Sequence, residues 1–233
     1  MPPQPTADFL KAGTVFAALP ATEILALAAV AREQSYPARD FIFREGDESA
    51  WFWLVRTGRV KILRQSRSGD EVVLELLGPG EPFGGVAVLE GRPYPASAQA
   101  METSTVVGIP RAPIVALAAR HPMLAREMAL MLGRRLRTAH DSVKSLATDP
   151  VEARLASTLI RLAEGEGTHD PRGLVLPFRL TRQTLADMCG TTVETTIRVI
   201  SRWIRKGIVI DEDGRLIVAS LETLREIEDT GSL

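Results

Sequence analysis

The chain has little of what several classes of protein require. Its single cysteine, Cys189, excludes an internal disulfide framework and any zinc or iron–sulfur site built only from the cysteines of one chain. None of its three histidines lies in residues 1–120, and its apolar runs, such as residues 24–31, are far too short to cross a membrane. We therefore expect no metal site and no membrane partner.

The N-terminal residues also lack the basic start and the apolar core of a secretory signal peptide. The 233 residues are 45% hydrophobic and 24% charged, with a formal net charge of −1, which is ordinary for a globular protein. We expect a cytoplasmic protein that is long enough for one large or two modest domains.

Residues 36–110 have the pattern of short antiparallel strands joined by tight turns. Glycines spaced eleven or twelve residues apart separate four apolar stretches, at residues 40–45, 51–58, 59–65 and 71–78. Residues 66–71 are typical of a hairpin tip, and residues 102–110 of a last strand. A short helix is expected before them, at residues 21–33. The pattern predicts a compact β-barrel or β-roll.

Metalloenzymes of the cupin type share this coarse strand pattern, so an enzyme is one alternative. Such enzymes hold a metal with paired histidines and a carboxylate on barrel strands, and residues 1–120 contain no histidine. The chain also offers no Ser-His-Asp or Cys-His set with suitable placement. The sequence therefore does not favour catalysis.

Residues 112–148 have a helical pattern with an apolar seam repeated every seven residues. The seam could pack on the β-roll of its own chain, but a helix of this length extends past a small barrel. We therefore expect two chains to associate as a homodimer through Leu132, Leu136, Ala139, Val143 and Leu146.

Asp149 is expected to be the hinge between two domains. Asp149, Pro150 and Glu152 have the spacing of a helix N-cap, a first helical residue and the returning carboxylate of a capping box. The expected domains are a sensor domain at residues 1–120, a long dimerisation helix at 121–148 and a DNA-binding domain at 149–233.

Residues 150–233 predict a winged helix. The expected order is a helix at 150–164, a loop at 165–173, a strand at 174–178, two helices separated by a turn at 189–191, and a hairpin at 207–218 with an Asp-Gly turn. With the β-roll and the long helix, this makes an α+β protein.

The helix after the turn has the features of a DNA recognition helix. Thr181 and Thr192 are predicted N-caps, and Gly190 lies where the turn needs an unusual backbone angle. Glu194 and Arg198 are one helical turn apart, so an intrahelical ion pair is one interpretation. The other is base recognition in the major groove, where Arg suits guanine and Glu accepts from cytosine.

The charge distribution favours base recognition. Between residues 178 and 206 six basic residues stand against two acidic ones, in an otherwise balanced chain. The predicted base contacts are Val193, Glu194, Ile197 and Arg198. The predicted phosphate contacts are Thr181, Arg182, Thr192, Ser201, Arg202, Arg205 and Lys206.

Residues 16–218 resemble a Crp/Fnr-family transcription regulator. The stretches that carry the resemblance lie at residues 41–47, 79–93, 134–136, 168–173, 180–190 and 193–200. The resemblance implies a cyclic-nucleotide-binding-type β-roll (jelly roll), a dimerisation helix and a winged helix. "VETTIR" (193–198) is similar to the Fnr branch, which implies a palindromic site with TTGA-type half-sites. Ile197 departs from the serine common in that branch.

The resemblance also locates an effector pocket, at Gly84, Gly85, Arg92, Tyr94, Ala139 and His140. In the cyclic-AMP-binding members, a Gly-Glu and an Arg-Ser pair hold the ribose and the phosphate, and a Thr-Ser pair meets the adenine. Here these positions are Gly84-Gly85, Tyr94-Pro95 and Ala139-His140. Because a buried phosphate without a charged partner is costly, we expect no binding of cyclic AMP unless Arg92 substitutes.

Residues 92–100 look like the corresponding segment of nitric-oxide-responsive, dissimilatory nitrate respiration regulators, which use haem. Of His121, His140 and His169, only His140 is a plausible axial ligand, and a structural role for it is the alternative. The chain lacks the cysteine cluster of Fnr-type regulators, so we expect no sensing of oxygen by an iron–sulfur cluster. Cys189 is interpreted as a small core residue, or alternatively as a thiol switch.

The loop at residues 164–173 resembles the region that contacts RNA polymerase in this family. The resemblance therefore implies an activator with RNA polymerase as a partner besides double-stranded DNA. A ligand-binding module that acts on protein partners is the competing interpretation.

Overall fold

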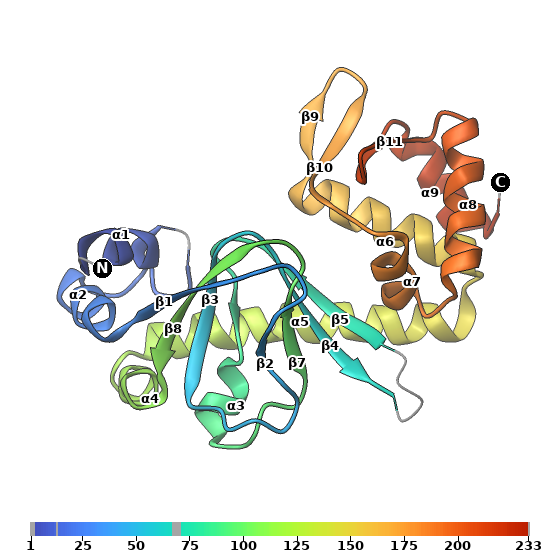
Figure 1. Cartoon of the computed structure of the whole chain (residues 1–233). Helices are drawn as coiled ribbons and strands as arrows, with labels where there is room; N and C mark the ends of the chain where they lie inside the picture. The colour runs from blue at the N-terminus through green and yellow to red at the C-terminus, as the bar shows by residue number, and fades with distance from the viewer. Residues whose placement is uncertain (1–2, 13, 67–70, 233) are drawn as a thin grey trace. The chain divides into compact units, whose positions relative to one another are not determined.

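The computed structural model in Figure 1 describes residues 3–12, 14–66 and 71–232. The chain divides into two compact units, Met1–Arg137 and Thr138–Leu233. The division falls inside the long helix α5 (Pro122–Thr148). The expected domain limits and the hinge at Asp149 stay predictions. No helix of the described chain is long and apolar enough to cross a membrane.

The first unit is a β-roll with helices at its ends. Its two four-stranded sheets have the strand orders β1-β8-β3-β6 and β2-β7-β4-β5. Figure 1 shows α1, α2 and α4 at one end of the roll. The elements are α1 (Pro3–Lys11), α2 (Ala21–Val30), β1 (Arg32–Tyr36), β2 (Phe41–Phe43), β3 (Trp51–Thr57), β4 (Val60–Gln65), β5 (Glu71–Leu77), β6 (Pro82–Phe83), α3 (Gly85–Glu90), β7 (Ser97–Ala100), β8 (Ser104–Pro110), α4 (Arg111–Arg120) and the beginning of α5.

The strand prediction is confirmed for the four apolar stretches and for the last strand, which is β8. The helix expected at residues 21–33 ends earlier, at Val30, because Arg32–Tyr36 pairs with β8 as strand β1. The hairpin tip predicted at residues 66–71 lies largely outside the described residues.

Strand alternation gives the roll two apolar clusters. Along β3, Phe52 and Leu54 belong to the cluster that includes residues of α1, α2, α4 and α5. Trp53 and Val55 belong to the cluster inside the roll, with Phe43 and other residues of the second sheet. Successive side chains of a strand point to opposite faces, so β3 joins the helices to the roll interior.

The second unit is a winged helix, as predicted. Its sheet has the strand order β11-β12-β10-β9, and α6 packs against α9 and the sheet. The Asp-Gly turn has positive φ at both residues, 52° at Asp213 and 84° at Gly214. The elements are the end of α5, α6 (Val151–Glu166), β9 (Thr168–Asp170), β10 (Gly173–Arg179), α7 (Arg182–Cys189), α8 (Val193–Arg205), β11 (Val209–Glu212), β12 (Arg215–Val218) and α9 (Leu221–Thr230).

Two local predictions in this unit are wrong. The loop expected at residues 165–173 contains strand β9, which pairs with β10. The capping box does not form, since α6 starts after Pro150 without a side-chain cap and the carboxylate of Glu152 bonds elsewhere. A negatively charged residue is favourable in the first turn of a helix whether or not it forms a capping box. The spacing of Glu152 alone therefore did not distinguish a capping box from the observed contact.

Replacing Gly190 by alanine should destabilise the second unit. Gly190 has φ +58°, where an L side chain adds about 1–2 kcal/mol of strain, and its Cβ would lie 2.6 Å from Leu146 Cδ2. The control is Gly165→Ala in α6, where nothing lies within 4 Å and alanine should stabilise the helix by about 0.5–1 kcal/mol. Urea unfolding measures both, and equal shifts for the two variants would contradict the expectation.

Candidate functional site

The helix–turn–helix is formed by α7 and α8, and its two predicted N-caps are confirmed. The Thr181 hydroxyl accepts a hydrogen bond from the Thr184 amide at 3.0 Å, and the Thr192 hydroxyl accepts one from the Thr195 amide at 3.2 Å. Gly190 ends α7 in the left-handed conformation, as predicted. Local hydrogen bonds thus set where each helix begins.

Helix α8 has one buried face and one outward face. Thr196, Val199, Ile200 and Trp203 are buried. Of the predicted base contacts, Glu194, Ile197 and Arg198 are exposed and Val193 is half-buried. The sequence therefore placed these four side chains on the correct face, and their contact with bases stays a prediction.

Glu194 and Arg198 do not form the ion pair that the alternative interpretation required. The salt bridges of the described residues include neither of them, although both are exposed one turn apart on α8. Both side chains are thus available to a partner outside the chain.

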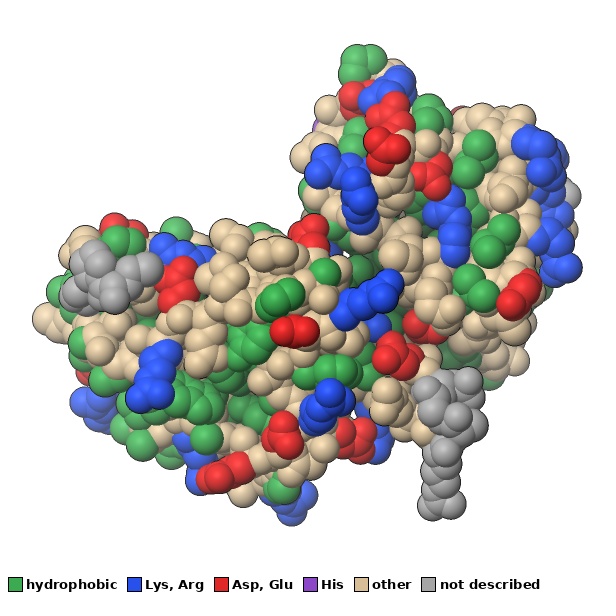
Figure 2. Space-filling view, viewed as in Figure 1, with side chains coloured by type: hydrophobic (Ala, Val, Ile, Leu, Met, Phe, Trp, Pro, Cys, Tyr) green, Lys and Arg blue, Asp and Glu red, His purple; other side chains and the backbone are tan. Residues whose placement is uncertain are grey.

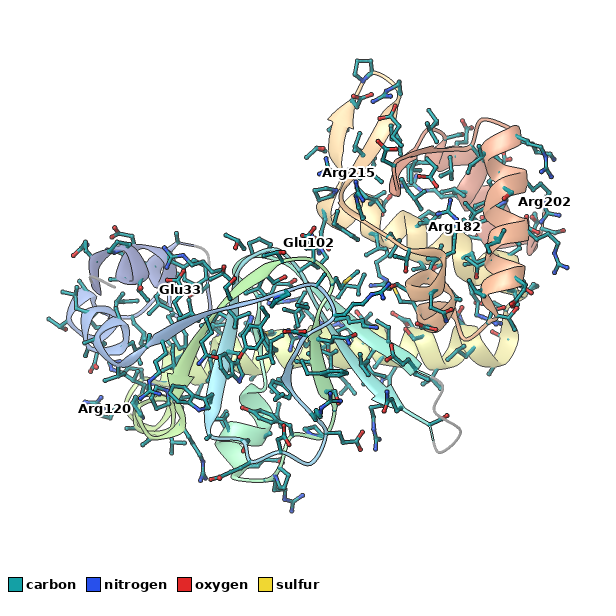
Figure 3. All side chains as sticks on the ribbon, viewed as in Figure 1. Glu33, Glu102, Arg120, Arg182, Arg202 and Arg215 are labelled. Atoms are coloured by element: carbon teal, nitrogen blue, oxygen red, sulfur yellow. The ribbon has the colours of Figure 1, made fainter. Side chains whose placement is uncertain are left out.

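The four basic residues among the predicted phosphate contacts divide into two groups. Arg205 and Lys206 are exposed at the end of α8, and Figure 2 shows basic side chains gathered beside this helix. Arg182 instead pairs with Asp211 at 2.5 Å, and Arg202 pairs with Glu152 of α6. Figure 3 labels the two arginines. Both therefore have a carboxylate partner within the unit, and the contact of the predicted residues with phosphates stays a prediction.

Glu152 contacts the helix–turn–helix in a way that the sequence did not reveal. Its side chain is only 11% exposed, and its carboxylate accepts a hydrogen bond from the indole nitrogen of Trp203 at 3.0 Å and another from Arg202. A buried Trp usually needs an acceptor for its N–H, but this requirement does not say which residue supplies it. The carboxylate joins α6 to the recognition helix.

Arg154 of α6 connects the same region to the turn of the helix–turn–helix. Its guanidinium donates to the carbonyl of Asp149 at 2.7 Å, to that of Cys189 at 2.9 Å and to that of Gly190 at 3.3 Å. The junction between α5 and α6 is therefore tied to the end of α7. No local sequence signal indicated this contact.

Cys189 is a core residue, as the first interpretation held. It is buried, and its sulfur lies 3.3 Å from the Thr158 hydroxyl. Burial raises the pKa of the Cys189 thiol, which keeps it protonated and unreactive near neutral pH. These observations do not favour a thiol switch.

A second candidate site is a cavity of about 150 Å³ in the first unit, between α3, β5 and α5. Gly84, Gly85 and Tyr94, all predicted to lie at the effector pocket, line it. Arg92, Ala139 and His140 are not among the lining residues, and all three are exposed. Their places are taken by side chains of α5 and β5 that the sequence did not indicate, namely Met128, Met131, Leu132, Arg135 and Glu75.

Tyr94 supports the cavity wall. Its ring stacks on Phe43 with centroids 3.7 Å apart, and its hydroxyl donates to the Trp51 carbonyl at 2.5 Å and accepts from Trp53 Nε1 at 3.2 Å. Burial raises the pKa of the Tyr94 phenol. With its hydroxyl fully used, Tyr94 is a structural residue.

The two glycines of this segment leave no room for side chains. Gly84 has φ +72°, and its Cβ would lie 2.8 Å from the Tyr94 ring. A Cβ at Gly85 would lie 2.8 Å from the Phe52 ring. The glutamate that cyclic-AMP-binding members carry at the second position would therefore displace a core aromatic ring.

Two family models match this chain, one in each unit. Residues 33–121 match the cyclic nucleotide-binding domain, and residues 153–227 match the Crp-like helix-turn-helix domain. The chain is 31% identical over 218 residues to the cyclic AMP receptor protein of Thermus thermophilus, which covers 94% of this chain and 98% of that protein. It is 25% identical over 205 residues to the anaerobic regulatory protein of Bacillus subtilis, with coverages of 87% and 86%.

The fold is also that of FixK2 from Bradyrhizobium japonicum. The two structures align with a TM-score of 0.76 at 23% identity, over 85% of this chain and 98% of that one. A cyclic-nucleotide-binding-type β-roll followed by a helix–turn–helix domain defines a transcription regulator. The chain belongs to the Crp/Fnr family of such regulators, which confirms the resemblance carried by the sequence motifs.

The cavity does not fit haem. A space of about 150 Å³ holds roughly one six-membered ring, whereas a haem carries four pyrrole rings. None of the three histidines lines it, and His121 instead lies 3.2 Å from a carboxylate oxygen of Glu23. Haem sensing therefore has no support from these side chains.

Glu152→Gln should loosen the recognition helix. Losing the charge weakens the bonds to Arg202 and Trp203, at a cost of about 1–3 kcal/mol in the free energy of unfolding. Glu164→Gln is the matched control, because Glu164 lies on the same helix in an exposed ion pair with Arg225 and should cost less than about 0.5 kcal/mol. Urea unfolding compares them, and a loss for Glu152→Gln no larger than the control's would refute the role.

Proposed function

We propose that this chain acts as a homodimer that binds a near-palindromic DNA site and regulates transcription in response to a signal received by the β-roll. The observation that carries the proposal is the outward face of α8, where Glu194 and Arg198 are exposed and form no salt bridge within the described chain. A recognition helix contacts base edges with its N-terminal residues, and these two lie in its first two turns.

The base contacts follow from the chemistry of the side chains. Arg198 can donate two hydrogen bonds to the O6 and N7 atoms of guanine, and Glu194 can accept from the cytosine amino group. Ile197, which is 47% exposed, offers an apolar surface to a thymine methyl group. This set suits TTGA-type half-sites, with Arg205 and Lys206 contacting phosphates at the end of the helix.

The seam on α5 supports the homodimer. Leu136, Val143 and Leu146 are each more than half exposed, which is unusual for large apolar side chains repeated along one helix. Pairing two such helices would bury them. The two recognition helices would then contact successive major grooves, about 34–36 Å apart on the duplex.

Activation through RNA polymerase is proposed from the family resemblance of residues 164–173, which include the β9–β10 hairpin. A regulator of transcription has to reach the DNA that it binds. We therefore include a cytoplasmic location in the proposal. We also propose that cyclic AMP is not the effector, because Gly84 and Gly85 offer no side chain to a ribose or a phosphate.

Arg198→Ala should weaken binding to the specific site by about 1–3 kcal/mol and relax the base preference there. Arg205→Ala is the control, because losing a phosphate contact should weaken specific and random DNA alike and lower the salt slope by about 1. Mobility-shift titrations over a salt series measure both variants. Equal weakening of Arg198→Ala on specific and random DNA would contradict the base contact.

Leu136→Asp should convert the dimer into single chains, since two carboxylates would face each other in the paired seam. Val115→Asp is the control, because Val115 is an exposed apolar residue of α4 outside the seam. Sedimentation equilibrium measures the mass. A wild-type protein that sediments as a single chain at micromolar concentration would refute the homodimer.

A further inference from the structure

The cavity in the first unit is apolar except for one ion pair. Rings of Phe43, Phe52 and Phe83 form part of its wall, and Met128 and Met131 contribute from α5. The only charged residues that line it in the described chain are Glu75 of β5 and Arg135 of α5. An apolar space with few convergent polar groups is the usual form of a small-molecule site.

The volume limits the size of the ligand. In other proteins an apolar cavity of about 150 Å³ accommodates a benzene molecule, and this cavity has the same volume. A nucleotide, with a purine, a ribose and a phosphate, is much larger. The space therefore suits a molecule built on a single six-membered ring.

The ion pair limits the charge of the ligand. Arg135 Nε lies 3.1 Å from a carboxylate oxygen of Glu75, and the same guanidinium donates to the Pro82 carbonyl at 2.7 Å. Both side chains are largely shielded from solvent, with exposed fractions of 25% for Arg135 and 33% for Glu75. The pair is neutral as a whole, so an anionic ligand would leave two carboxylates competing for one guanidinium.

A neutral hydroxyl satisfies both partners at once. It donates one hydrogen bond and accepts others, so it can donate to the Glu75 carboxylate and accept from the Arg135 guanidinium. Hydrogen bonds to charged groups are the stronger kind, and here they form beside an apolar wall. A ring without a hydroxyl would cover the ion pair without forming a hydrogen bond to either side chain.

We propose that the cavity binds a neutral, single-ring molecule that carries one hydroxyl group, held between Glu75 and Arg135. The ring fills the apolar space and the hydroxyl bridges β5 and α5. The assignment of this molecule as the effector rests on the proposed function, since α5 also carries the dimer seam. The binding itself does not depend on that function.

Isothermal titration calorimetry of the full-length chain with three matched probes tests the proposal. Phenol is neutral at pH 7 and carries the hydroxyl, toluene replaces the hydroxyl by a methyl group, and benzoate carries a negative charge. Phenol should bind saturably, and toluene and benzoate should each bind about tenfold more weakly or worse. Cyclic AMP should give no saturable binding at micromolar concentration.

Removing the charge of Glu75 should reverse the preference for charge. In Glu75→Gln the Arg135 guanidinium loses its carboxylate, so benzoate should gain about tenfold and phenol should lose about tenfold. Glu45→Gln is the matched control, because Glu45 pairs with Arg64 on the surface of the same unit and does not line the cavity. The order of the probes should stay unchanged in that variant.

Several results would overturn the proposal. They are equal binding of toluene and phenol, benzoate binding at least as tightly as phenol, no saturable binding of phenol, and micromolar cyclic AMP binding. The wild-type comparison does not require any variant to fold. A mobility-shift titration on the same preparation separates the two proposals, because specific DNA binding without phenol binding refutes only the ligand, and phenol binding without specific DNA binding refutes only the function.

Discussion

One buried carboxylate holds the recognition helix in place. Glu152 lies in α6, at the start of the winged helix, and bonds to two neighbouring residues of α8, Arg202 and Trp203. The other buried side chains of this face, among them Val199 and Ile200, contribute apolar packing, which is less directional than a hydrogen bond. Hydrogen bonds to fixed points specify the rotation of α8 about its axis. The hydrogen bonds of Glu152 to Arg202 and Trp203 therefore help to set the direction in which the exposed face of α8 points.

The cavity of the first unit is bounded by glycines, which have no side chains, as well as by aromatic rings. Gly84 and Gly85 bring the backbone against the rings of Tyr94 and Phe52. A family that binds cyclic nucleotides with side chains at such positions can retain its β-roll while it loses those contacts. The same architecture then leaves a small apolar space whose polar groups come from β5 and α5. The β-roll thus serves as a scaffold, and a few side chains on it determine which ligand can bind.

The elements that could be predicted are those with local signals. Thr181, Thr192 and Gly190 mark the helix–turn–helix because caps and turns depend on neighbouring residues. Glu152 and Arg154 could not be assigned, since the contacts that tie them to α7 and α8 are with residues more than thirty positions away along the chain. In the cavity, the position of a helix relative to a sheet decides which of its side chains enter, and no sequence pattern fixes that. For the same reason the sequence indicated Gly84 and Gly85 but not the residues of α5 that line the cavity.

Leu132 belongs to two surfaces at once, because it lines the cavity and also begins the apolar seam of α5. Where ligand binding and chain association are coupled through such a shared side chain, each changes the other's equilibrium constant by the same factor. If a bound ligand strengthens the association of two chains, then association must raise the affinity for the ligand by the same factor. On the proposed function, the abundance of the protein would then act as a second signal, because a cell that makes more of it would change the effector concentration at which the regulated genes respond.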